Sequence, residues 1–138
     1  MINIGIVGGA GYTAGELVRI LLHHPEAKIV SVMSGSHAGE VVSKAHPDLE
    51  GETELVFTDK LAQNLDVAFL CTGHGKSKQV LEEVQISSTT KIIDLSADFR
   101  IAEASNDFIY GLPELNREVI KSSQKVANPG CFATCIQL

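Results

Sequence analysis

The residues best suited to chemistry stand near the end of the chain, in Asn128-Pro129-Gly130-Cys131. A short apolar stretch, residues 125–127, runs into this turn, and residues that can begin a helix follow the cysteine. A strand, a tight turn and a helix in that order lift a thiol out of the interior. The first turn of a helix carries about half a positive charge, which favours the thiolate, the nucleophilic form of cysteine. Cys131 is therefore a candidate nucleophile, and the alternative is a small buried cysteine.

A glycine-rich segment, residues 8–15, follows an apolar run at residues 2–7 and precedes apolar residues at helical spacing. Free N–H groups at a helix start can hold a pyrophosphate, and glycines let it approach. Gly8, Gly11 and Ala14 have the spacing of such a loop, and Thr13 followed by Glu16 is a capping-box pattern that predicts a helix start at Thr13. We interpret this segment as a dinucleotide-binding loop, and the alternative is a βα turn without a ligand.

Two serines follow the second predicted strand, residues 27–33, at the position where NAD-binding proteins place a carboxylate for the ribose 2′-hydroxyl. Ser34 and Ser36 can instead donate hydrogen bonds to a 2′-phosphate, and no carboxylate repels it. This favours NADP, although no arginine is present at this point. The alternative is that both serines are ordinary loop residues.

Two further groups follow apolar strands. Gly73 and His74 come after residues 66–71, and we expect them to line the same crevice, unless His74 merely completes a turn. Arg100 follows residues 91–95, where its planar fork suits an anionic substrate; alternatively it pairs with Asp98 or another surface acid. Cys71 closes an apolar strand and is expected in the core.

The pattern of apolar residues predicts the elements that position these groups. Strands are expected at residues 2–7, 27–33, 55–57, 66–71, 91–95 and 123–127. Helices are expected from residue 13, as a short segment capped by Asp59, after the second glycine loop and from Pro113, with an irregular excursion at residues 40–54. This alternation predicts an α/β fold with a doubly wound parallel sheet of the Rossmann dinucleotide-binding type.

Composition excludes several functional classes. The chain has 138 residues, 44% hydrophobic, and a net charge of −6 without a basic run, so we expect no nucleic-acid partner. It has no apolar run of the roughly 20 residues that a membrane span needs, and its N-terminal pattern leads us to expect no signal peptide. Three cysteines without a paired framework suggest a cytoplasmic protein, and the five histidines show no metal-ligand spacing beyond an isolated Cys71-x-x-His74. The chain stops inside an apolar helix, so we expect a piece of a longer protein.

Six motifs, in order along the whole chain, resemble the N-terminal part of the N-acetyl-gamma-glutamyl-phosphate reductase family of arginine biosynthesis, within the semialdehyde dehydrogenase group. They are GGAGYTAGEL at residues 8–17, HAG with HPDLEG at 37–51, the strand with GHG at 66–75, DLSADFR at 94–100, YGLPELN at 110–116 and NPGCFATC at 128–135. The combination of DLSADFR, YGLPELN and NPGC is specific, whereas one of them alone would not be.

The resemblance implies an NAD(P)-binding domain at residues 1–130 and, at residues 131–138, the beginning of a second, catalytic α+β domain. That domain would supply the catalytic histidine and a homo-oligomer interface forming a dimer or tetramer. By resemblance Cys131 is the nucleophile, Ser34 and Ser36 hold the 2′-phosphate, and the cofactor loop is Gly8, Gly11, Tyr12, Thr13 and Ala14. The chain departs from the family at Gly35, where an arginine is common and whose absence keeps NAD open, and at Ala14, where glycine is usual.

The implied reaction is NADPH-dependent reduction of N-acetyl-gamma-glutamyl phosphate to the semialdehyde through a thioester on Cys131, with Arg100 holding the acyl phosphate. An aspartate- or aminoadipate-semialdehyde dehydrogenase would use the same chemistry on another acyl group, although YGLPELN favours the glutamyl branch. A nucleotide-binding module without catalysis is the third possibility, which turnover assays would test.

Overall fold

Seven strands form one sheet in the computed structural model, which describes residues 1–138. The strand order is β3-β2-β1-β4-β5-β7-β6, and every neighbouring pair is parallel. The strands are β1 Ile2–Val7, β2 Ala27–Met33, β3 Phe57–Thr58, β4 Val67–Leu70, β5 Lys91–Asp94, β6 Ile109–Tyr110 and β7 Lys125–Ala127. The predicted parallel α/β sheet is therefore confirmed.

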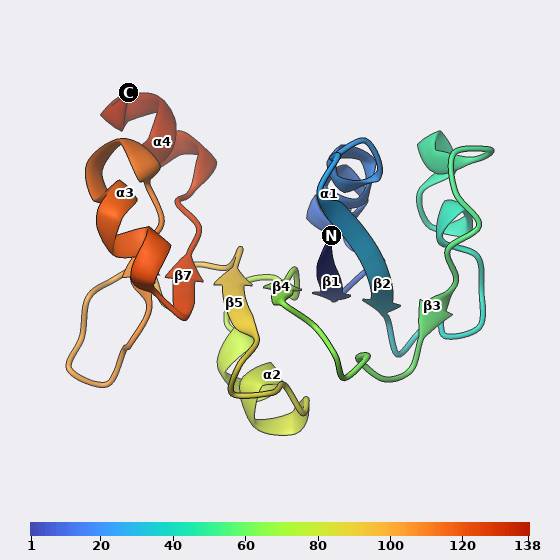
Figure 1. Ribbon diagram of the computed structural model, residues 1–138, viewed down its shortest axis with the longest axis horizontal. Coiled ribbons are helices and arrows are strands. Elements are labelled where there is room, and N and C mark those ends of the chain that lie inside the picture. Colours follow the sequence, from blue (N-terminus) through green and yellow to red (C-terminus); the bar gives the residue numbers. More distant parts are fainter.

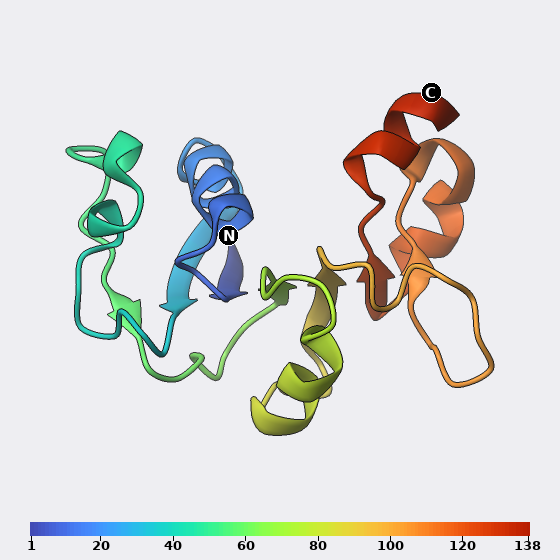
Figure 2. The same ribbon diagram turned by 180° about the vertical axis from the view of Figure 1, so that it is seen from behind.

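Helices cover both faces of this sheet. They are α1 Tyr12–Leu22, α2 Ser77–Glu83, α3 Pro113–Ser122 and α4 Cys131–Gln137, with single 3₁₀ turns η1 Val42–Lys44 and η2 Pro47–Leu49. Figures 1 and 2 show α1 on one side of the sheet and α2 on the other. Such double coverage explains why the central strands read as apolar runs rather than as alternating patterns.

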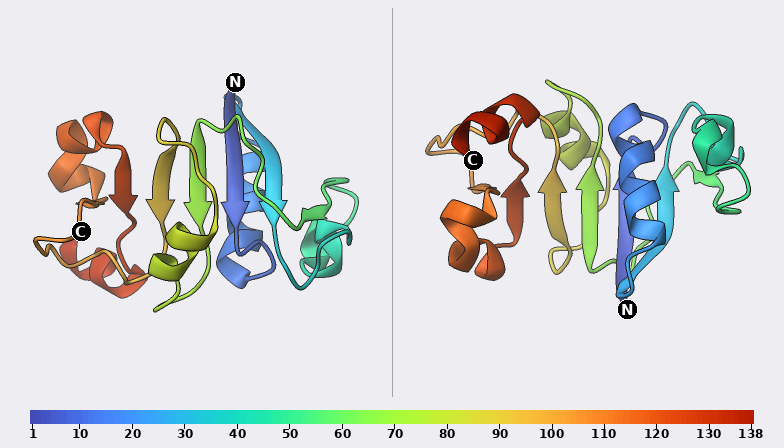
Figure 3. Two further views of the ribbon diagram at one scale, coloured as in Figure 1. Left: turned by 90° about the horizontal axis from the view of Figure 1, so that it is seen from below. Right: turned by 90° about the horizontal axis from the view of Figure 1, so that it is seen from above.

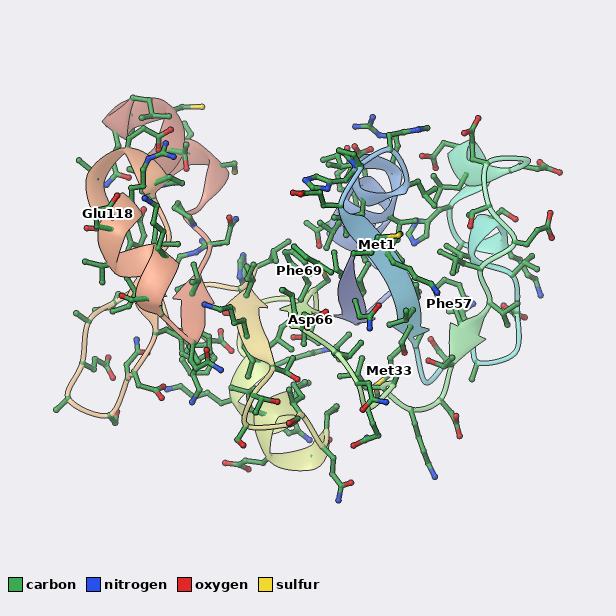
Figure 4. The ribbon with its side chains drawn as sticks, viewed as in Figure 1. Met1, Met33, Phe57, Asp66, Phe69 and Glu118 are labelled. Carbon is green, nitrogen blue, oxygen red and sulfur yellow. The ribbon has the colours of Figure 1, made fainter.

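Two cores result, one on each face. Ile6 and Val18 belong to the core under α1, together with Phe57, which is labelled beside β3 in Figure 4. Leu70 and Ile92 belong to the core on the α2 side. The sheet is therefore covered by a buried hydrophobic core on both faces, and this packing holds the ends of its strands in fixed positions.

The strand order reverses between β1 and β4, because β2 and β3 extend to one side of β1 and β5 and β7 to the other. Ligands of open parallel sheets bind outside the carboxyl ends of the strands at such a reversal. Both glycine loops follow strands at this point, and Figure 3 shows α4 at the same edge of the sheet. The topology therefore defines one edge for the candidate site.

The predicted capping box at the start of α1 is wrong. The helix begins at Tyr12 with Gly11 as its N-cap, and no side chain caps it. Glu16 does not reach back to Thr13; its carboxylate pairs with Arg19 at 2.6 Å instead. The capping-box prediction fails because the helix already begins at Tyr12, directly after the glycine turn, so Thr13 lies inside the helix and not at its N-cap.

The short helix expected after Asp59 is also absent, since residues 59–66 form bends and irregular backbone. Leu61 and Leu65 bury their side chains there against Gly5 of β1, where an added Cβ would lie 2.8 Å from Leu61 and 2.5 Å from Leu65. These leucines fill the space that a side chain at Gly5 would occupy. This packing on β1, rather than local helix formation, decides the path of the segment.

Strands β4, β5 and β7 are one or two residues shorter than predicted, and the two edge strands differ further. β3 covers residues 57–58 rather than 55–57, and β6, which was not predicted, precedes α3 and makes β7 the seventh strand. Both are two-residue edge strands, whose pairing depends on the neighbouring strand rather than on a local apolar pattern. No helix of the protein combines the length and the apolar character that a membrane crossing requires.

Candidate active site

A pocket of about 600 Å³ lies at the carboxyl edge of the sheet. It brings together Cys131, Arg100, His74 and Thr13, which come from four different segments of the chain. Leu95, Leu112, Glu114 and Asn128 also line it. The two glycine loops and the cysteine turn, which the sequence separates by more than fifty residues, therefore meet at one cavity.

Cys131 is the first residue of α4 and is exposed to solvent in this pocket. Gly130 is the N-cap, and its carbonyl accepts hydrogen bonds from the N–H and the hydroxyl of Thr134, both at 2.9 Å. All three cysteines are free thiols. Cys135, one helical turn further along α4, is exposed as well.

The turn before Cys131 is held from both sides at Asn128. Its N–H donates to the carbonyl of Asp94 at 2.8 Å, and its own carbonyl accepts from Nε of Arg100 at 2.9 Å. Nη2 of Arg100 donates to the carbonyl of Leu95 at 2.9 Å. The alternative that Arg100 pairs with Asp98 is therefore wrong, and the guanidinium braces the cysteine turn while it lines the pocket.

A buried carboxylate holds the second glycine loop. Asp94 has no exposed surface and accepts hydrogen bonds from the hydroxyls of Ser77 at 2.5 Å and Ser96 at 2.6 Å. Ser77 is the first residue of α2 and Ser96 follows β5. Buried charge needs such partners to remain stable, so this cluster fixes the start of α2 against the end of β5.

Asp98 completes the same support. Its carboxylate accepts from the N–H of Gly75 at 2.6 Å and from that of Ser77 at 2.9 Å. Partial burial alone would raise the pKa of Asp98, but these N–H groups and the Ser96 hydroxyl hold it below its usual value. Asp98 therefore takes up backbone donors that precede and begin α2.

His74 lines the pocket from the second glycine loop. Its Nδ1 accepts a hydrogen bond from the N–H of Ala97 at 3.0 Å, so a neutral ring carries its proton on Nε2. Gly73 and Gly75 have φ angles of 80° and 78°, which only glycine adopts readily. The loop thus presents His74 between two glycines whose conformation other residues would strain.

The first glycine loop packs closely on the end of β4. Gly8 has a φ of 81°, and an added Cβ would lie 2.6 Å from the carbonyl oxygen of Cys71. The N–H groups of Gly8 and Gly9 both donate to the carbonyl of Met33, at 3.1 and 2.8 Å. Cys71 is buried as predicted, and this burial raises the pKa of its thiol to about 12.

Three N–H groups of this loop have no partner within the protein, those of Ala10, Tyr12 and Thr13. Tyr12 and Thr13 begin α1, and their side chains are exposed. Ala14 is fully buried, so its side chain packs the helix closely on the sheet. Unpaired donors at a helix start with glycines beside them fit the phosphates of a dinucleotide.

Ser34 and Ser36 lie at the end of β2, outside the Cys131 pocket. Ser34 is buried, Ser36 is exposed, and their hydroxyl oxygens are 3.5 Å apart. A Cβ added to Gly35 between them would meet no atom within 4 Å. The loop therefore has room for a larger side chain at residue 35, and its glycine does not reflect crowding. Nowhere do three or more His, Cys, Asp or Glu side chains gather as around a metal ion.

The model of the semialdehyde dehydrogenase NAD binding domain matches residues 3–123. The chain belongs to this family. It is 56% identical over 139 residues to N-acetyl-gamma-glutamyl-phosphate reductase of Bacteroides fragilis, covering 100% of the chain and 43% of the relative. It is 56% identical over 136 residues to the protein of that name from Christiangramia forsetii, covering 99% and 42%. The chain thus spans less than half the length of these relatives.

A solved structure has the same fold. The chain superimposes on aspartate semialdehyde dehydrogenase with NADP from Candida albicans with a TM-score of 0.66, at 18% identity, covering 95% of this chain and 43% of that one. This likeness concerns the arrangement of the sheet and its helices. The semialdehyde dehydrogenase domain seen here is therefore the familiar parallel sheet of that group.

Three residues with structural roles in this semialdehyde dehydrogenase domain were not predicted from the sequence. Asp94 was quoted only as part of a motif, Asn128 only as part of a turn, and His46 was given no role. An acidic residue directly after the two isoleucines of β5 was a signal for Asp94, because an unpaired buried carboxylate is costly. No local signal marks the contact of His46, which is described below.

Proposed function

We propose that this chain is the cofactor-binding and nucleophile-bearing part of an enzyme that reduces N-acetyl-gamma-glutamyl phosphate to N-acetylglutamate semialdehyde and phosphate, in arginine biosynthesis. The observation that carries the proposal is the meeting of the Cys131 thiol, Arg100 and the first turn of α1 at one pocket. The names of the curated relatives, at 51–56% identity across the chain, support the acyl group.

NADPH is the proposed cofactor. The unpaired N–H groups of Ala10, Tyr12 and Thr13 would hold its pyrophosphate, and Gly73 and His74 would lie beside it. The hydroxyls of Ser34 and Ser36 would bind the 2′-phosphate, which no nearby carboxylate of this loop repels. NADH remains the alternative, because Gly35 stands where many family members have an arginine.

The proposed chemistry begins with attack of the Cys131 thiolate on the acyl carbonyl. Free N–H groups of Cys131, Phe132 and Ala133, in the first turn of α4, steady the developing oxyanion. Arg100 has donors left after its two carbonyl contacts, and these hold the phosphoryl oxygens. The carbon–oxygen bond to phosphate breaks, phosphate leaves with the electron pair, and a thioester remains on Cys131. When bound, NADPH supplies the hydride that reduces this thioester to the aldehyde and releases the thiolate.

We further propose that residues 1–130 form the NAD(P)-binding domain and residues 131–138 begin a second, catalytic domain. Phe132, Ile136 and Leu138 of this last segment are all more than 70% exposed, which suits a surface that further protein covers. The greater length of the curated relatives supports this division. The second domain would supply the general acid–base histidine and the contacts of a homo-oligomer in the cytoplasm.

Replacement of Cys131 tests this function in the complete protein. Cys131→Ser should lose nearly all reductive turnover yet bind NADPH as the wild type does, because the thiol attacks the substrate and does not hold the cofactor. Cys135→Ser is the matched control, since it removes an exposed thiol one helical turn away, and it should keep its turnover. Wild-type kcat in Cys131→Ser would refute the nucleophile assignment.

The substrate and cofactor need separate assays. Aldehyde formation from aspartyl, glutamyl and N-acylated glutamyl phosphates should be fastest with the N-acetylated compound, and a preference for aspartyl phosphate would move the protein to the aspartate branch. Fluorescence titrations should show that the protein binds NADPH more tightly than NADH. Equal affinities for the two cofactors would remove the proposed NADP preference. If the complete protein bound the cofactor but turned over none of these substrates, the remaining interpretation would be a nucleotide-binding module without catalysis.

A further inference from the structure

His46 lies in the irregular excursion between β2 and β3, far from the thiol in sequence and outside the residues assigned above to the cofactor or substrate. It is 7% exposed and immediately precedes η2. Its backbone N–H donates to the carbonyl of Val42 at 3.1 Å, which keeps the residue in the turn of η1. A buried histidine in a loop needs partners for its ring, and these partners lie in the glycine loop and α1.

The ring forms a hydrogen bond to one peptide group of the glycine loop. Nε2 of His46 lies 2.7 Å from the carbonyl oxygen of Gly9. A carbonyl only accepts, so Nε2 carries the proton and donates. The peptide between Gly9 and Ala10 is planar and trans, so its C=O and its N–H point in opposite directions. By holding the carbonyl, His46 sets the direction of the Ala10 N–H, which is one of the three unpaired donors of the loop.

Gly15 provides the space for this ring. A Cβ added to Gly15 would come within 3.0 Å of Nδ1, Cε1 and Cγ of His46. Glycine inside a helix is unfavourable relative to alanine, so its presence in α1 requires a packing reason, and the histidine ring is that reason. The ring of Phe57 also neighbours that of His46, with the two ring centroids 6.3 Å apart. The ring thus has one position, in contact with the loop.

We infer that His46 is a positioning residue for the cofactor pyrophosphate, acting through the peptide between Gly9 and Ala10. This inference rests on the proposed dinucleotide site. A loop with several glycines has many accessible conformations, and binding must select the one whose N–H groups converge. His46 makes that selection before the ligand arrives, so its effect belongs to binding of the phosphates and not to the chemistry at Cys131.

The test compares three variants of the complete protein and two ligands. His46→Phe keeps a ring but removes the donor, His46→Gln keeps a donor at the position of Nε2, and His23→Phe alters an exposed histidine at the end of α1 as a control. The ligands are NADPH, which has the pyrophosphate, and adenosine 2′-monophosphate, which lacks it. Loss of one hydrogen bond predicts about tenfold weaker NADPH binding for His46→Phe, with adenosine 2′-monophosphate unchanged, kcat at saturating NADPH nearly unchanged, and recovery in His46→Gln.

Gly15→Ala gives an independent arm, because it displaces the ring while leaving His46 in the chain. It should weaken NADPH binding to a similar extent, and the double variant Gly15→Ala/His46→Phe should be no weaker than either single variant. If His46→Phe does not fold, Gly15→Ala alone decides the question.

Two results would overturn the inference. One is an NADPH affinity within twofold of wild type in both His46→Phe and Gly15→Ala. The other is an equal loss of affinity for NADPH and for adenosine 2′-monophosphate in these variants. Absence of NADPH binding by the wild type would instead refute the proposed function.

Discussion

Arg100 donates a hydrogen bond from Nε to the carbonyl oxygen of Asn128 at 2.9 Å, across 28 residues of sequence. The same guanidinium donates from Nη2 to the carbonyl of Leu95, so it joins the end of β5 to the turn that carries Cys131. An arginine that lines the pocket therefore also determines where the thiol stands. Substrate binding and nucleophile placement would depend on one side chain.

Arg100→Lys separates these two contributions. Lysine keeps the positive charge but has a single ammonium group, which does not reproduce the fork that reaches both carbonyls. We expect kcat/KM to fall by about 100-fold, because small displacements of a reacting group have costs of that size. Alkylation of Cys131 by iodoacetamide in the absence of substrate should also change at least severalfold. An unchanged alkylation rate with a raised KM would show that Arg100 acts on the substrate alone.

Gly130→Ala tests the packing of the Arg100 guanidinium against the cysteine turn. Gly130 has φ −69° and ψ 145°, which any residue adopts, but its added Cβ would lie 2.8 Å from Nη1 of Arg100. We expect a loss of about 1–3 kcal/mol of stability, as for other overpacked sites, and lower activity. Thermal and urea unfolding followed by circular dichroism measure the loss. The double variant Gly130→Ala/Arg100→Ala should be no less stable than Arg100→Ala, and additive losses would argue against the contact.

Asp98 predicts a pH dependence of stability. Its pKa in the folded protein lies below the ordinary value of 3.8, owing to the N–H groups of Gly75 and Ser77. A lowered folded-state pKa stabilises the protein above the unfolded-state value and loses this effect as the pH falls through the folded-state value. Asp98→Asn should therefore lower the melting temperature near neutral pH, and the difference from wild type should shrink below about pH 4. A constant difference between about pH 3 and pH 7 would contradict the role of its charge.

The two thiols at the carboxyl edge should differ sharply in reactivity. Burial raises the pKa of Cys71 to about 12, so almost none of it is thiolate near neutral pH, whereas Cys131 is exposed in the pocket. Iodoacetamide at neutral pH, followed by mass spectrometry of peptides, should modify Cys131 and leave Cys71 unmodified until the protein is denatured. Equal rates at both cysteines in the folded protein would contradict the burial of Cys71.

The sequence determined the features that depend on neighbouring residues. β2 was predicted at residues 27–33 with the bounds that the structure has, because a run of apolar residues between turns is a local pattern. The turn before Cys131 and both glycine loops were placed correctly for the same reason. Parallel strands align their carboxyl ends at one edge, so the meeting of His74, Arg100 and Cys131 followed from the predicted topology.

Only the tertiary structure decided the partners of these side chains. Arg100 meets Asn128 across 28 residues, and His46 meets Gly9 across 37, and no pattern within a window of the sequence encodes either contact. The bends at residues 59–66 and strand β6 were missed for the same reason, since Leu61 packs on Gly5 and β6 pairs with β7. Local propensity selects strands, turns and helices, whereas hydrogen-bond partners and packing are selected only when distant segments come together.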